Sequence, residues 1–200
     1  MNNKAATLLR AALTLGLALL LGSIVLGTNT VQEKQKSTFS VTDKAVITAF
    51  EERVKEYIKL RERIKERLPK LSKDSTPEQI EAHKRAFEQA LRAARGNAKR
   101  GDIFTPAVAD YIRRTIKAEF QGKDRKELRK TILEAETQGV LMRVNYPYPE
   151  AKELTEMPPT VLLNLPQLPK EVKYRFVGQN MLLVDRETGL ILDYMLDALP

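Results

Sequence analysis

The chain has 200 residues, a formal net charge of +8, no cysteine and a single histidine, His83. The missing cysteines exclude disulfides, thiolate metal sites, a lipid-modified cysteine and cysteine nucleophiles, and one histidine excludes multi-histidine metal centres. Packing alone must therefore hold the fold together.

An apolar run, AALTLGLALLLGSIVLG, extends from Ala11 to Gly27 and follows two cations, Lys4 and Arg10. Cations before such a run stay in the cytoplasm while the run enters the bilayer. About 17 residues span roughly 25 Å as a helix, which is long for a signal core and short for a membrane span. We expect residues 1–27 to be a signal peptide or a transmembrane anchor. The rest of the chain is then exported, either periplasmic or on the outer face of the cytoplasmic membrane, and it stays anchored if the run is not cleaved.

The charge is unevenly distributed along the chain. Residues 28–40 are polar and lack periodicity, which predicts a flexible tether. Residues 140–200 carry six cations against eight acids, so the positive surplus lies between Thr28 and Gly139. This surplus favours anionic partners: lipid headgroups, envelope polymers or acidic proteins. Export argues against nucleic acid.

The spacing of apolar residues within 41–139 predicts a basic helical domain of four amphipathic helices that share one core. The first begins at Val41, is capped by Thr42 or Asp43 and ends near Pro69. The second opens at Ser75-Thr76-Pro77-Glu78, where Ser75 caps the helix and Glu78 bonds back. Its predicted inner face is Ile80, Phe87, Leu91 and Ala94.

The third predicted helix opens at Thr105-Pro106 and the fourth at Asp124, running to Gly139. The fragment from Val140 to Asn145 is strand-like, and the prolines after it force an extended segment. A short helical stretch follows Met157 through Leu163.

The C-terminal part shows the alternation typical of β-strands. Apolar and polar residues alternate in Val172–Phe176, and the mostly apolar runs Met181–Val184 and Leu190–Met195 follow, with turn residues between the three runs. They predict a three-stranded antiparallel meander, or four strands with Val140–Asn145, packed on the helices. The predicted fold class is therefore α+β: an N-terminal signal or anchor helix, a basic four-helix region and a C-terminal meander of three to four strands, with residues 140–200 as the Pro-rich segment and meander.

Two groups of residues are candidate binding sites. The first is a cationic surface for an anionic partner, formed by Arg92, Arg95, Lys99, Arg100, Arg113, Arg114 and Lys117. Helix C-terminal cations that interact with the dipole are the alternative explanation for Arg92 and Arg95. The second is a peptide groove lined by Tyr146, Tyr148, Tyr174 and Tyr194. Ordinary sheet packing explains these tyrosines equally well.

The segment YRFVGQNMLLVDRETGLILDYMLDALP, Tyr174 to Pro200, resembles the C-terminal meander of uncharacterised exported bacterial envelope proteins. The resemblance implies an envelope location and a β-structure for this segment. It implies no activity and no functional residue.

No nucleotide-binding, esterase or metalloprotease motif occurs in the sequence. Asp185 and Asp193 flank the last turn, and the strand register decides whether they converge. His83 is interpreted as a structural residue. We therefore predict no enzyme, no cofactor and no metal. The expected function is that of a non-catalytic envelope protein, an accessory, assembly or scaffold subunit acting through protein–protein contacts. The alternatives are a periplasmic module that binds anionic lipid or polymer through its basic helices, and an acid-dependent hydrolase.

Overall fold

Helix α1, Val41–Arg67, is built on a stripe of apolar residues spaced three and four apart. The side chain of Ser40 caps it by accepting a hydrogen bond from the Asp43 amide, so the predicted caps Thr42 and Asp43 are wrong. The helix ends at Arg67, and the backbone of the C-cap residue Leu68 is extended because Pro69 follows. Its buried face points into the core.

The structure, a computed structural model, describes residues 40–120, 126, 130, 133, 140–149 and 159–199.

Helix α2, Pro77–Ala94, begins with a capping box, but one residue later than predicted. Thr76 accepts from the Gln79 amide and the Gln79 side chain accepts from the Thr76 amide. This register puts Pro77 at the first helical position, where its fixed φ fits. Phe87 and Leu91 are buried as predicted, whereas Ile80 is 45% exposed. Ala94 is exposed as well, so the predicted inner face is too long at both ends.

Helix α3, Pro106–Glu119, has Thr105 as its cap and a proline in its first turn, as predicted. Its buried residues are Val108, Ala109, Tyr111, Ile112 and Ile116. The short helix α5, Pro159–Leu162, contacts α3, and α1 contacts both α2 and α3.

The sheet consists of β1 (Val172–Val177), β2 (Asn180–Asp185) and β3 (Ile191–Met195), antiparallel and in chain order. Gly178 has a φ of 54° at the first position of the two-residue turn between β1 and β2, as a type II′ hairpin turn requires. The predicted three-stranded meander and the α+β class are thus confirmed. These strands form the sheet of an α+β structure.

The predicted fourth strand, Val140–Asn145, is wrong. Asn145 has a φ of 65°, and the Tyr146 amide donates back to the Arg143 carbonyl, so the chain turns where a strand would continue. Beyond this turn the backbone pairs with the free edge of β3. The Asn145 amide donates to the Ile191 carbonyl, and Pro147 forms an isolated bridge with Leu190.

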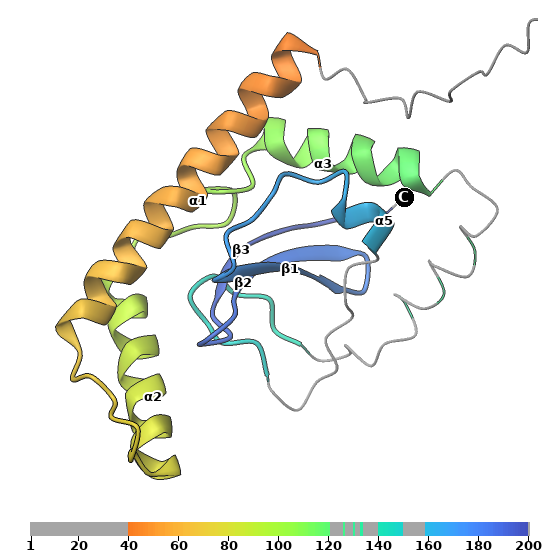
Figure 1. The fold of residues 1–200 in the computed structure, drawn as a ribbon. Coiled ribbons are helices and arrows are strands. Elements are labelled where there is room, and N and C mark those ends of the chain that lie inside the picture. Colours follow the sequence, from red (N-terminus) through yellow and green to blue (C-terminus); the bar gives the residue numbers. More distant parts are fainter. Residues whose placement is uncertain are drawn as a thin grey trace, which may run out of the picture. The chain divides into compact units, whose positions relative to one another are not determined.

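Both faces of the sheet are packed. Figure 1 shows α1 and α3 beside the strands. One face contacts α1, α2 and α3, and Phe50, Phe104 and Tyr174 stack there with ring centroids 5.9 to 6.4 Å apart. The other face carries Leu182, Val184 and Ile191, which pack with Tyr148. The sheet therefore separates a large helical core from a small second core.

Several predicted segments lie outside the described residues. They are the apolar run and tether at residues 1–39 and most of the predicted fourth helix. Within the part of the chain that is described, no helix is both long and apolar enough to cross a membrane. The segment Thr38–Pro200 forms one compact unit.

Candidate functional site

Two of the predicted cations of α2 contact the sheet region. Arg95 donates a 2.8 Å hydrogen bond to the Leu192 carbonyl, and its guanidinium lies 5.2 Å from the Tyr57 ring centroid. Burial lowers the pKa of Arg95. Arg92 stacks over Tyr146 at 4.6 Å. Both side chains therefore join α2 to other parts of the fold.

The two arginines of α3 are likewise engaged within the chain. Arg113 donates to the carbonyls of Leu196 and Asp197 at 3.0 and 3.1 Å. Arg114 pairs with the Asp43 carboxylate at 2.8 Å, which connects α3 to the first turn of α1. These contacts hold the C-terminal segment and α1 against α3.

The remaining predicted cations are exposed. Arg100 lies over Tyr194, with 5.6 Å between the guanidinium carbon and the ring centroid. Lys99 and Lys117 are exposed. The seven predicted cations thus divide into arginines with partners inside the chain and two exposed lysines.

The four predicted groove tyrosines lie in different surroundings. Tyr174 belongs to the helix-facing core, where its hydroxyl donates to the Pro166 carbonyl at 3.0 Å. Tyr148 is buried in the second core, with Tyr194 packed against it. Tyr146 lies beneath Arg92 and Arg143. Tyr174 thus lies in a different core from Tyr148 and Tyr194, and Tyr146 contacts two arginines, so these four side chains do not line one groove.

Asp185, at the end of β2, is a fully buried carboxylate. Its Oδ2 accepts from the Tyr57 hydroxyl at 2.7 Å and from Arg61 Nε at 2.9 Å. Its Oδ1 accepts from the amides of Glu187 and Thr188 at 3.0 and 2.9 Å. Burial raises the pKa of Asp185, but these hydrogen bonds and the Arg61 charge outweigh it, and the net pKa is lowered.

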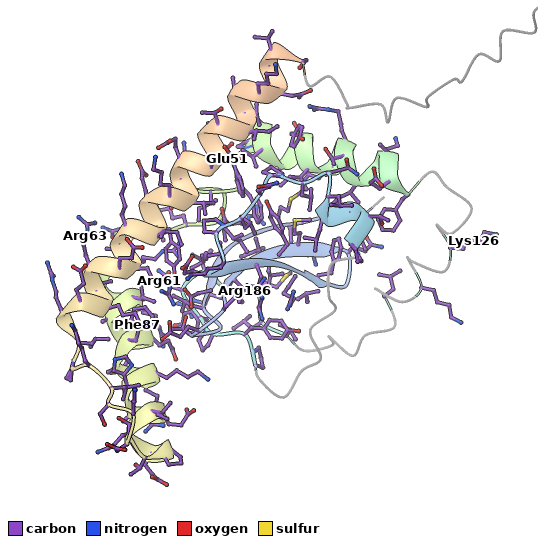
Figure 2. All side chains as sticks on the ribbon, in the orientation of Figure 1. Glu51, Arg61, Arg63, Phe87, Lys126 and Arg186 are labelled. Carbon is purple, nitrogen blue, oxygen red and sulfur yellow. The ribbon has the colours of Figure 1, made fainter. Side chains whose placement is uncertain are left out.

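Arg61 and its neighbours extend this network to the surface. Arg61 also bonds Glu187, which accepts from Lys65 Nζ at 2.8 Å. Arg61 leaves α1 on the side that faces the sheet, whereas Arg63 points outward (Figure 2). The network therefore fastens α1 to the turn between β2 and β3.

Asp193, in β3, is the second fully buried carboxylate. It accepts hydrogen bonds from the amides of Gly101, Ile103, Phe104 and Tyr194 at 2.7 to 2.9 Å. Burial raises the pKa of Asp193 by more than these hydrogen bonds lower it, so the net pKa is raised. Asp185 and Asp193 are thus bound by different segments and act as two separate structural clamps.

A hollow of about 380 Å³ lies along the outer edge of β1. Four cations contribute to its lining, Lys170, Lys173, Arg175 and Arg186, together with Tyr174, Gln167 and apolar residues of the segment that follows α5. None of the described residues that line it is a carboxylate. We name this site the cationic hollow.

Local structure positions these cations. Lys173 and Arg175 alternate with the buried residues Val172, Tyr174 and Phe176 along β1, so both leave the strand on the side away from the helical core. Arg186, labelled in Figure 2, comes from the turn after β2. Its Nε donates to the Val172 carbonyl at 3.3 Å. The sequence signal for the two strand residues was their alternation; Arg186 joins them only through the fold.

A second depression, of about 630 Å³, lies between the end of α1, the connection to α2 and α2 itself. Leu68, Pro69 and Leu71 supply apolar surface, and charged residues of both signs surround them. His83, which is half-buried, lies at this depression. We name it the hairpin groove.

Comparison with protein-family models, with curated proteins and with solved structures finds no match to the chain. Function is therefore inferred from the residues and their geometry.

Proposed function

We propose that the protein is a non-catalytic binding protein of the cell envelope whose cationic hollow binds anionic groups. The observation that carries this proposal is the lining of the hollow: four cations and, among the described residues, no carboxylate. Lys170 and Arg186, the two exposed cations of the lining, would attract a bound anion. Phosphate and carboxylate groups match lysine and arginine donors.

Two further features support binding over catalysis. Asp185 and Asp193, the fully buried carboxylates, accept four or more hydrogen bonds each, which uses their oxygens for structure. The envelope location rests on the apolar run Ala11 to Gly27 and the cations before it. An envelope protein meets phosphate-bearing and carboxylate-bearing lipids and polymers, which are suitable ligands for such a hollow.

The test uses the full chain in a non-ionic detergent, with inorganic polyphosphate as the probe. Replacing Lys170→Gln together with Lys173→Gln should weaken binding roughly thirty-fold, since each cation near an anionic surface contributes about 1 kcal/mol. The matched control is Lys59→Gln with Arg63→Gln, which removes the same charge from a depression that also contains Glu56, Glu62 and Glu66. Equal losses in both double variants would reject the hollow as a site.

A third double variant examines the surface predicted on the helices. Lys99→Gln with Lys117→Gln removes its two exposed lysines. If this pair, and not the pair in the hollow, accounts for polyphosphate binding, the anion site lies on the helices.

The hairpin groove favours a second function, that of an accessory or assembly subunit that contacts another envelope protein. Its apolar lining includes an exposed side chain, Leu71, which is 43% exposed. Apolar surface ringed by charges of both signs is typical of contact sites between proteins. Leu71→Asp should release a partner that co-purifies from native membranes, whereas retention of that partner by the variant would exclude the groove.

A further inference from the structure

Two leucines lie at the rim of the cationic hollow. Leu162, the last residue of α5, lines the hollow and is 44% exposed. Leu163, the next residue, is 84% exposed. Single exposed leucines are common on protein surfaces, but an adjacent pair beside a cluster of cations is a specific combination.

The surrounding contacts fix these leucines in an outward orientation. Val161 and Leu165, on either side of the pair, are both buried. Asn164 donates to the Glu119 carboxylate at the end of α3 and to the Thr160 carbonyl, at 2.8 and 3.2 Å. The segment is thus held at both ends, and little conformational entropy remains to be lost when the leucines meet a partner.

Cations and apolar side chains on one surface match the interface of an anionic membrane. Acidic headgroups attract lysine and arginine, and leucine side chains enter the boundary between headgroups and acyl chains. A soluble polyanion would use the cations and leave the leucines in water.

We propose that the cationic hollow binds the headgroups of anionic lipids while Leu162 and Leu163 insert into the membrane interface. This inference rests on the proposed function of the hollow and specifies its ligand as a lipid surface.

The chain contains no tryptophan, so Leu163→Trp provides a single fluorescent reporter at the rim of the hollow. The substituted full chain is added to vesicles of phosphatidylcholine with phosphatidylglycerol, and separately to vesicles of phosphatidylcholine alone. Emission of the introduced tryptophan should move to shorter wavelength with the anionic vesicles only. Because the reporter is local, insertion of the N-terminal run does not by itself produce this shift. Leu71→Trp, on the connection between α1 and α2, is the control reporter and should show no shift.

The cations are then removed in the reporter chain. Lys170→Gln with Lys173→Gln should raise the anionic lipid needed for half of the shift roughly thirty-fold. An equal shift with neutral vesicles, or no dependence on the lysines, would overturn the inference.

Polyphosphate separates failure of the lipid inference from failure of the anion site. Lysine-dependent polyphosphate binding without a tryptophan shift would overturn the lipid surface and leave the proposed function standing. If replacing the two lysines reduces neither polyphosphate binding nor the tryptophan shift, both the lipid inference and the proposed function are overturned.

Discussion

Arginines of the helices and cations at the edge of β1 differ in what they contact. Arg61, Arg95 and Arg113 each donate to an acceptor in the C-terminal part of the chain, and they join the helices to it. Lys170 is instead exposed and lines a hollow open to solvent. The arginines that join the helices to the C-terminal part should matter for folding, and the cations of the hollow for binding.

This contrast reverses the expectation from charge counting. Residues 140–200 carry more acids than cations, yet they supply the cationic hollow. Some of their acids are buried or paired within the fold. Asp185 and Asp193 are fully buried, and Glu187 pairs with Arg61 and Lys65. Burying carboxylates shifts the charge of the remaining surface toward the positive. The distribution of charge in the fold, and not its sum along the sequence, locates the candidate site.

The largest effect is expected from Arg61→Ala. This change leaves the buried Asp185 carboxylate without its guanidinium partner, which typically costs about 3–5 kcal/mol of unfolding free energy. Urea denaturation followed by circular dichroism measures the loss. Arg63→Ala, two residues away and exposed, is the matched control and should change stability by less than about 0.5 kcal/mol. Similar losses of unfolding free energy in both variants would contradict the distinction between cations with a structural role and exposed cations.

The two buried carboxylates should respond to pH with opposite signs. The folded-state pKa of Asp185 is lowered, so its contribution to stability is present above the unfolded pKa and is lost as pH falls through the folded pKa. The folded-state pKa of Asp193 is raised, so the wild-type carboxyl gains stability as pH falls through the folded pKa towards the unfolded pKa. The measured cost of Asp185→Asn, about 2–4 kcal/mol at neutral pH, should therefore shrink on acidification, and that of Asp193→Asn should grow.

Urea titrations of the wild type and both variants at pH 7 and at progressively lower pH give the comparison. Parallel changes for Asp185→Asn and Asp193→Asn would contradict the opposite directions of the two pKa shifts.

Local sequence signals predicted the elements better than their boundaries. Thr105-Pro106 set the start of α3, while alternation in β1 and turn residues between the apolar runs located the three strands. The capping box of α2 was predicted one residue too early because Ser75 with Glu78 and Thr76 with Gln79 both match the pattern. The second pair forms the box, since it places Pro77 at the first helical position. The strand predicted at Val140–Asn145 failed because Asn145 adopts a left-handed conformation, which an apolar pattern does not reveal.

The candidate site was less accessible to sequence reasoning. A run of cations near the end of α2 drew attention to Arg92 and Arg95, but their partners, Tyr146 and the Leu192 carbonyl, are distant in sequence. Arg186 reaches Val172 only because β1 and β2 are paired. Long-range pairing thus decides which cations come together in the cationic hollow.

The smallest effect on stability is expected at the hollow itself. Lys170 is exposed, and replacing it with glutamine removes one positive charge near Lys173, Arg175 and Arg186. Lys170→Gln should therefore be neutral or raise the free energy of unfolding by a few tenths of a kcal/mol, and more so at low salt because screening weakens repulsion between the cations. Urea denaturation at low and high ionic strength measures this change. A loss of about 1 kcal/mol or more would assign Lys170 a structural role like that of the helix arginines, whereas a salt-dependent gain is the mark of a site in which like charges are held together for a ligand.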